Sequence, residues 1–223
     1  PNRWTMVKDT VQLQNQKALM PDAKLNCLLG GMVSIILPQI EIVLDALALS
    51  NCAYNVDNEN SPRYKDNAEI PNGWTEIKDL EKEFGTKIET SLTNPLNGFK
   101  AKLFKNGDMY ILAFAGTELK DDEGNFNLKD AITDGKQAFG LDDKEEGQYV
   151  DAVYLSNAIG SKIEEDNEKG GDKKLIITGH SLGGGLATIG GAKTGAETYT
   201  FNAAGVHEQT FKDQNVGIEN TRH

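Results

Sequence analysis

The sequence predicts an α/β fold, a sandwich of helices around a mainly parallel β-sheet. Two short runs, residues 110–115 and 174–178, are predicted to be buried strands: the first is almost wholly apolar, as is usual for a strand buried on both faces of a sheet, and the second has the apolar centre Leu175-Ile176-Ile177. Residues 128–139 and 147–167 lie between these runs and are predicted to be helical. Strands that are separated by helices favour a parallel sheet, because parallel neighbours need a crossover connection.

The other elements follow from turn residues and from the spacing of apolar side chains. Asn106-Gly107 between two apolar runs predicts a hairpin over residues 99–115. Apolar residues at helical spacing predict a helix that starts near Pro38 and ends near Tyr54. We also expect a loop over 55–73, a short helix over 74–84 closed by Gly85, a polar loop over 117–126, a glycine-rich helix over 181–192, a strand over 198–201 and a short helix over 207–212.

The first 37 residues differ from the rest of the chain. Residues 11–14 alternate between apolar and polar, residues 32–37 are rich in β-branched side chains, and Gly30-Gly31 lies between them. These features indicate short strands joined by a turn. We therefore predict a β-rich appendage over residues 1–37 and an α/β domain over residues 38–223.

Composition excludes several classes of protein. The formal net charge of −11 repels phosphates, so nucleic acid is not an expected partner. The most apolar segment, residues 25–37, is too short to cross a bilayer, and residues 1–20 lack the apolar stretch of a signal peptide. We expect a soluble protein made in the cytoplasm, without a metal or cofactor. Cys27 and Cys52 are too few for a disulfide framework, and we expect two buried thiols, with a single bridge between them as the alternative.

The strongest motif is Gly179-His180-Ser181-Leu182-Gly183, which follows the apolar run 174–178 and opens a predicted helix. A Gly-x-Ser-x-Gly sequence in that place permits a sharp strand-to-helix turn that holds the serine hydroxyl at its tip. The N-terminus of the helix directs partial positive charge and free N–H groups toward a developing oxyanion. We predict that Ser181 is a nucleophile, whereas its neighbour His180 points elsewhere and either packs in the core or supports a residue of the site.

A second segment, Phe114-Ala115-Gly116-Thr117, ends the other apolar run. An oxyanion hole takes one N–H from the residue after the nucleophile and another from a loop after an adjacent strand. Leu182 and Thr117 are the predicted donors.

These two segments resemble the class 3 lipase family, which has the α/β-hydrolase fold. Its pattern is a Phe-x-Gly-Thr strand end followed, several dozen residues later, by a Gly-His-Ser-Leu-Gly-Gly turn, and the similarity covers roughly residues 40–220. Residues 128–134 resemble its Asp-Trp-x-x-Asp-Leu segment without the tryptophan. The resemblance implies hydrolysis of lipid esters (phospholipids or triacylglycerols) through an acyl-serine, and a lid over residues 117–127.

The general base and acid of such an enzyme are not evident in the sequence. In the family they follow the serine in the order acid, then histidine, beyond the strand after the short helix. The sequence ends about where that strand is expected, so we predict that both groups belong to a C-terminal part of the same polypeptide. His207 is the internal candidate for the base.

Residues 18–35 resemble the closing segment of PAAR-like domains, which cap the spikes of contractile secretion systems. This resemblance implies a toxin effector of type VI secretion that attacks the membrane lipids of a target cell without using a signal peptide. Its partners would be a secretion-spike protein and an immunity protein.

Two alternatives remain open at the sequence level. In the first, the protein is a serine esterase or thioesterase for a small soluble substrate. In the second, it is a catalytically incomplete module for binding or delivery. A P-loop at 190–194 is excluded because Ala187 and Ala192 replace the glycines it needs. An EF-hand at 121–125 is excluded because Phe126 replaces the required glycine.

Overall fold

The computed structural model describes residues 4–13, 16–26, 32–34, 40–61, 64–65, 67–116 and 143–217. The chain separates into two units, Pro1–Val43 and Leu44–His223. In the first unit, β1 (Trp4–Leu13), β2 (Gln16–Asn26) and β3 (Met32–Ser34) form an antiparallel sheet in the order β1-β2-β3. The predicted β-rich character of this segment is confirmed.

The second unit contains a larger sheet in the strand order β4-β6-β7-β8-β9, with β5 also paired to β6. Its strands are β4 (Thr75–Ile77), β5 (Thr93–Asn94), β6 (Phe99–Asn106), β7 (Met109–Phe114), β8 (Lys174–His180) and β9 (Glu197–Phe201). The helices are α1 (Ile40–Cys52), which begins at the end of the first unit, α2 (Leu80–Phe84), α4 (Asp143–Glu168), α5 (Leu182–Thr194) and α6 (Glu208–Asp213).

The α/β class is confirmed, but the sheet is mixed rather than mainly parallel. β7, β8 and β9 are parallel neighbours, whereas β4, β5 and β7 all run antiparallel to β6. The predicted hairpin explains part of this difference. Asn106 pairs with Met109, so only Gly107 and Asp108 connect β6 to β7, and so short a connection can join antiparallel strands only. Gly107 has a φ of 58°, as the first central position of such a turn demands.

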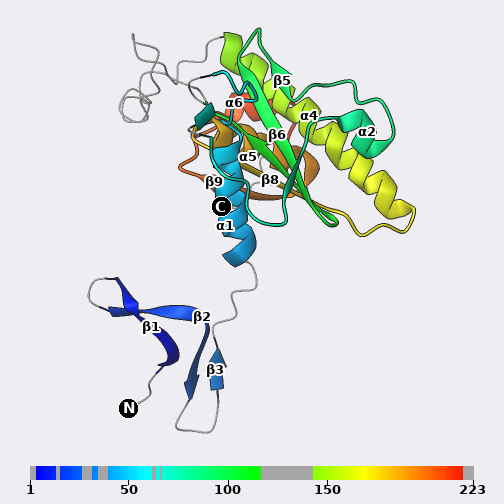
Figure 1. Cartoon of the computed structure of the whole chain (residues 1–223). Helices are drawn as coiled ribbons and strands as arrows, with labels where there is room; N and C mark the ends of the chain where they lie inside the picture. Colours follow the sequence, from blue (N-terminus) through cyan, green and yellow to red (C-terminus); the bar gives the residue numbers. More distant parts are fainter. Residues whose placement is uncertain are drawn as a thin grey trace, which may run out of the picture. The chain divides into compact units, whose positions relative to one another are not determined.

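The sheet lies between α1 on one face and α4 with α5 on the other (Figure 1). Alternate residues of β7 divide accordingly. Tyr110, Leu112 and Phe114 join the main hydrophobic cluster with α4 and α5, and all three are fully buried. On the opposite face, the Thr178 hydroxyl of β8 donates to the carbonyl of Ala46 in α1 over 3.2 Å. The burial of β7 on both faces is the reason for its nearly unbroken apolar sequence.

The predicted helix over residues 74–84 is only partly correct. Residues Thr75–Ile77 pair with β6 as β4, and the helix starts at Leu80, where the Asp79 side chain accepts from the Lys82 N–H. Gly85 ends α2 in the left-handed conformation, as predicted. Pairing with β6, which is distant in sequence, makes the first part of this segment a strand although its apolar spacing is helical. The predicted helix near 128–139 and the lid at 117–127 lie outside the described residues.

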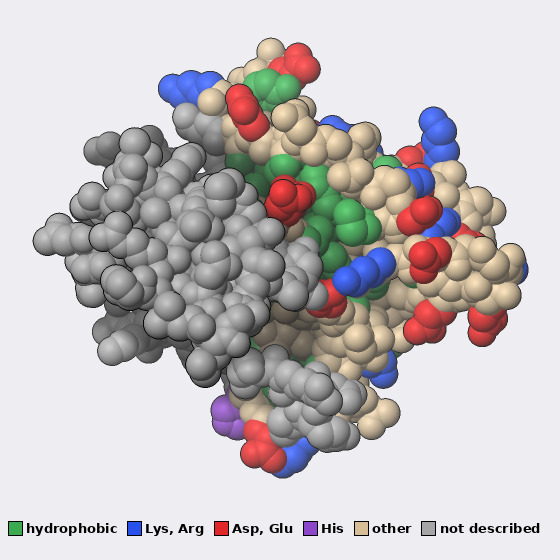
Figure 2. Space-filling model, turned by 90° about the horizontal axis from the view of Figure 1, so that it is seen from below, with side chains coloured by type: hydrophobic (Ala, Val, Ile, Leu, Met, Phe, Trp, Pro, Cys, Tyr) green, Lys and Arg blue, Asp and Glu red, His purple; other side chains and the backbone are tan. Residues whose placement is uncertain are grey.

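The described surface mixes charges and apolar side chains. Figure 2 shows acidic and basic side chains interspersed around a group of hydrophobic ones on the face seen from below. On α1, Ile40, Leu44 and Leu47 are exposed. No helix in the described part of the chain is both long enough and apolar enough to span a bilayer.

Candidate active site

The predicted sharp turn is present at Ser181. The residue joins β8 to α5 with φ 56° and ψ −128°, a backbone conformation that side-chain-bearing residues rarely adopt. Its N–H donates to the carbonyl of Phe201 over 3.1 Å, and its own carbonyl accepts from the N–H groups of Gly184 and Ala204, each over 2.9 Å. Hydrogen bonds to β9 and to the segment after it therefore hold this conformation in place. Such strained residues are concentrated at functional sites.

Two glycines of the motif are required by close backbone contact. A Cβ atom on Gly179 would lie 2.0 Å from the carbonyl oxygen of Gly183. A Cβ atom on Gly183 would lie 2.3 Å from the carbonyl oxygen of Phe114, at the end of β7. No side chain fits at either position, so the glycines allow the strand, the turn and the helix to approach one another.

The predicted oxyanion donors are described only in part. Leu182 is the first residue of α5 and is buried, so its N–H belongs to the first helical turn, where N–H groups have no intrahelical partner. Thr117 lies outside the described residues. The last described residue of that segment is Gly116, and its Cβ position would be 3.2 Å from the Gly183 nitrogen. The end of the β7 segment therefore lies directly against the turn that carries Ser181.

Neither of the two described histidines has the surroundings or hydrogen bonds that a catalytic base requires. His180 is half-buried, and burial lowers the pKa of its imidazole, which favours the neutral form. His207 is exposed and caps α6, because its Nδ1 accepts from the Gln209 N–H over 3.1 Å. In a serine triad, Nδ1 instead donates to the acid and Nε2 accepts the serine proton. An Nδ1 acceptor leaves the neutral ring protonated on Nε2, so the observed arrangement of His207 does not suit a base.

The acidic residues described after Ser181 are also engaged elsewhere. Glu197 contacts Lys174 and the Tyr199 hydroxyl. Glu208 pairs with Lys212 over 2.6 Å, and Asp213 accepts from Gln209 over 2.7 Å. Glu219 lies outside the described residues.

Sequence reasoning missed Tyr54. Its hydroxyl lies between the turn and the β7 end: it accepts from the Gly116 N–H over 2.8 Å and donates to the His180 carbonyl over 3.2 Å. The sequence carries no signal of this contact, since 126 residues separate Tyr54 from His180.

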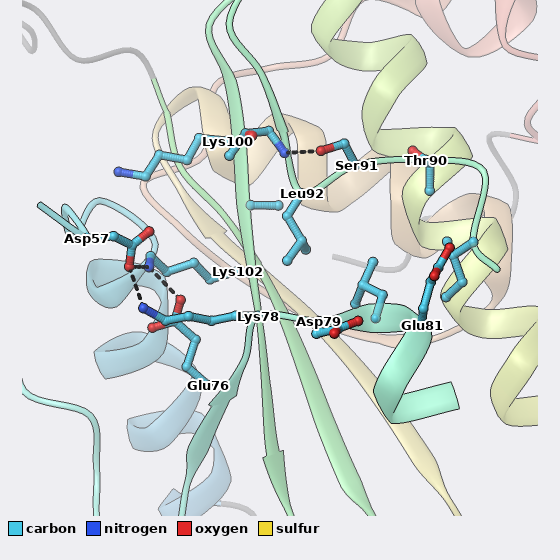
Figure 3. A pocket seen from close by; sticks show the side chains of 14 residues that line it. Asp57, Glu76, Lys78, Asp79, Glu81, Thr90, Ser91, Leu92, Lys100 and Lys102 are labelled. Atoms are coloured by element: carbon cyan, nitrogen blue, oxygen red, sulfur yellow. Dashed lines mark hydrogen bonds and ion pairs between the residues drawn. The ribbon is translucent and has the colours of Figure 1, made fainter. Parts of the chain in front are cut away.

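A cavity of about 600 Å³ lies at another place, along the edge of β6 where β4 ends and β5 begins (Figure 3). Its lining includes neither Ser181 nor its neighbours. Lys102, almost fully buried, reaches Glu76 at 2.6 Å and Asp57 at 3.3 Å, and Lys78 reaches Asp57 at 2.8 Å. Because the charges of these lysines and carboxylates neutralise one another, the side chains on this side of the cavity form a structural ion-pair network.

The described residues meet neither the requirements of a metal site nor those of a reactive cysteine. In the described ranges, no three His, Cys, Asp or Glu side chains come together as a metal site requires. Cys52 is a buried free thiol, and burial raises its pKa to about 11, so it is not a reactive thiolate. Cys27 lies outside the described residues.

Comparison with known proteins gives three similarities. Residues 48–223 match the model of a Tle-like phospholipase domain. An extracellular phospholipase A1 of Serratia liquefaciens is 38% identical over 129 residues, which are 58% of this chain and 34% of that protein. The chain thus spans about a third of the length of this curated relative. A lipase from Rhizopus microsporus var. chinensis, 17% identical, aligns over 80% of this chain and 63% of its own with a TM-score of 0.46.

Proposed function

The chain belongs to the family of Tle-like phospholipase domains, and we propose that it is a serine carboxylic-ester hydrolase whose nucleophile is Ser181. The observation that carries the proposal is the turn itself. A half-buried serine with φ 56° and ψ −128° stands at the N-terminus of α5, between a buried strand and a helix. This is the arrangement that a nucleophilic serine of an α/β-hydrolase requires.

The reaction proceeds in two steps. The Ser181 Oγ attacks the ester carbonyl carbon, its proton passes to a general base, and the carbonyl oxygen becomes an oxyanion that accepts from the N–H groups of Leu182 and Thr117. The C–O bond then breaks, the alcohol leaves with the proton, and the acyl group remains on Ser181. A water molecule, deprotonated by the same base, releases the carboxylic acid and restores the serine.

We propose that the base and the acid are groups other than His207 and the acids described after Ser181. Two observations support this. The Nδ1 of His207 is used as an acceptor in a helix cap, and the acids Glu197, Glu208 and Asp213 bind other side chains. Activation of Ser181 then depends on groups outside this described set, so we assay hydrolysis on the complete natural polypeptide.

The proposed substrate is a membrane phospholipid cleaved at the sn-1 ester. Support comes from the family, and from the Serratia protein, whose name is that of a phospholipase A1. A triacylglycerol is the second lipid substrate to be tested.

The proposed context is attack on a competing cell. The family and the PAAR-like resemblance of residues 18–35 together support a type VI secretion effector. Such an effector is carried by a spike protein and neutralised in the producing cell by an immunity protein.

Phospholipids with different acyl chains at sn-1 and sn-2 test this function. Vesicles of zwitterionic phosphatidylethanolamine are suitable, because a net charge of −11 disfavours anionic surfaces. We expect the complete polypeptide to release the sn-1 fatty acid, and Ser181→Ala to release none. Ser156→Ala, at a buried serine on α4, is the matched control and should retain activity.

Three results would separate the alternatives. Cleavage of soluble esters or thioesters without cleavage of vesicles favours a small-substrate esterase. Equal release of fatty acid by wild type and Ser181→Ala would contradict the proposal that Ser181 is the nucleophile. Binding of vesicles without any hydrolysis favours a delivery module.

A further inference from the structure

Tyr54 joins two segments that the proposed function places on either side of the oxyanion. Its hydroxyl accepts from the Gly116 N–H over 2.8 Å, and Gly116 directly precedes Thr117. The same hydroxyl donates to the carbonyl of His180 over 3.2 Å, and His180 directly precedes Ser181. One side chain is therefore in contact with the residue before the second oxyanion donor and with the residue before the nucleophile.

The backbone around Tyr54 is held by hydrogen bonds to β6, to β8 and to the loop at Ala68. The Lys100 ammonium on β6 donates to the Tyr54 carbonyl over 3.1 Å. Next along the chain, the Asn55 side chain donates to the Ala68 carbonyl over 2.8 Å and accepts from the Ala68 N–H over 2.7 Å. Earlier in α1, Ala46 accepts from Thr178 on β8. The phenol therefore stands on a backbone that is held before, at and after residue 54, so it can position another group.

Gly116 is fitted closely against this hydroxyl. A Cβ atom on Gly116 would lie 2.7 Å from the Tyr54 Oη and 3.1 Å from the His180 carbonyl oxygen. Because the Gly116 N–H already donates to Tyr54, it does not serve as an oxyanion donor. Its hydrogen bond instead fixes Gly116, the last described residue before Thr117 in the sequence.

We propose that Tyr54 is a positioning residue for the oxyanion hole, acting through Gly116 and His180. This inference rests on the proposed function of Ser181. Oxyanion donors stabilise the transition state only when they are held at hydrogen-bond distance from the developing charge. A small displacement of the Gly116 segment then slows acyl transfer more than it weakens the binding of substrate in its ground state.

The variant Tyr54→Phe removes the hydroxyl and keeps the ring. For the complete polypeptide, we expect kcat for ester hydrolysis to fall by roughly 10- to 100-fold with KM changed by less than about two-fold. The affinity of a trifluoromethyl ketone, which forms a tetrahedral adduct with the serine, should fall in parallel with kcat/KM. Amide hydrogen exchange at Gly116 should accelerate, whereas exchange at Leu112, inside β7, should not.

Tyr110→Phe is the matched control. The Tyr110 hydroxyl is also hydrogen-bonded, to Glu83 over 2.6 Å, and the residue is fully buried near the opposite end of β7. Loss of that hydroxyl should lower thermal stability, while kcat, the ketone affinity and exchange at Gly116 stay at wild-type values. A purely structural effect of Tyr54→Phe would instead resemble this control.

Two results would overturn the inference while leaving the proposed function intact. One is unchanged exchange at Gly116 in Tyr54→Phe, and the other is a kcat no lower than that of Tyr110→Phe. If wild type and Ser181→Ala hydrolyse ester equally, the proposed function fails and the positioning role fails with it.

Discussion

The turn at Ser181 and the charged edge of the sheet at Lys102 are held in place in opposite ways. At the turn, backbone meets backbone: the Gly183 Cβ position lies 2.3 Å from the carbonyl oxygen of Phe114. At the edge, contacts are made by long side chains, with Lys102 Nζ 2.6 Å from Glu76 and 3.3 Å from Asp57. Backbone cannot withdraw from an added atom, whereas long side chains can move toward solvent. The site of the proposed chemistry should therefore tolerate far less change than the largest described charged network.

The largest expected effect is that of Gly183→Ala. Its Cβ would overlap backbone atoms of both Phe114 and Ala115, so the turn and β7 must separate. We expect the free energy of unfolding to fall by about 4 kcal/mol or more, measured by chemical denaturation. Gly205→Ala is the control, because that glycine has open space around its Cβ position and should change stability by less than about 0.5 kcal/mol. Equal stability of Gly183→Ala and Gly205→Ala would show that the turn tolerates an added atom, and its contrast with the edge would then disappear.

A smaller effect is expected for Lys102→Ala. The lysine side chain is only 5% exposed, but its partners Glu76 and Asp57 are 17% and 64% exposed and can be hydrated when it is removed. We expect a loss of about 1–3 kcal/mol, below the range for a fully buried pair. Lys162→Ala breaks an exposed pair with Glu165 and should cost less than about 0.5 kcal/mol. A loss for Lys102→Ala as large as that for Gly183→Ala would show that the edge is as rigid as the turn.

Gly190 on α5 and Ser156 on α4 provide an intermediate case at the contact between these two helices. The Gly190 Cβ position lies 2.3 Å from the Ser156 Oγ, a side-chain atom, and Ser156 Oγ is the one fully buried side-chain oxygen or nitrogen among the described residues that has no hydrogen-bond partner. Ser156→Ala should therefore be neutral or stabilising by up to about 1 kcal/mol. Gly190→Ala should destabilise by about 2 kcal/mol, and the double variant should recover at least about 1 kcal/mol of that loss. Additive effects of the two substitutions in denaturation experiments would contradict the contact.

The smallest effect concerns the pH dependence of the edge. The hydrogen bond from Lys78 holds the pKa of Asp57 below 3.8, its ordinary value. A lowered carboxyl pKa stabilises the fold above that ordinary value, and the contribution is lost as the pH falls through the pKa of the folded state. Asp57→Asn should therefore be slightly less stable than wild type near neutral pH, and the difference should shrink below pH 3.8. A difference that stays constant across this range would indicate that the ion pairs of Asp57 contribute nothing.

The contrast also explains what the sequence could reveal. The turn was predictable because its requirements are local: a buried strand, two glycines around a serine, and a helix that follows. The hairpin at Gly107 was predictable for the same reason. The identification of Ser181 and Leu182 as candidates needed no knowledge of distant partners.

Features that depend on distant pairs were missed. Thr75–Ile77 forms a strand because β6 lies beside it, and Trp74 donates to Asp45 over 2.8 Å, which no local pattern indicates. Tyr54 ends a predicted helix and has no motif, so only the three-dimensional arrangement brings it to Gly116. The mixed direction of the sheet could have been partly inferred, since the predicted hairpin already required one antiparallel pair.

The most direct test of the central claim is to find the residue that a fluorophosphonate probe modifies. The complete natural polypeptide is labelled, digested and analysed by mass spectrometry, with Ser181→Ala and Ser156→Ala in parallel. The account predicts a single phosphonylated peptide that contains Ser181, lost in Ser181→Ala and kept in Ser156→Ala. A probe adduct on another residue, or no adduct on a polypeptide that hydrolyses esters, would contradict it.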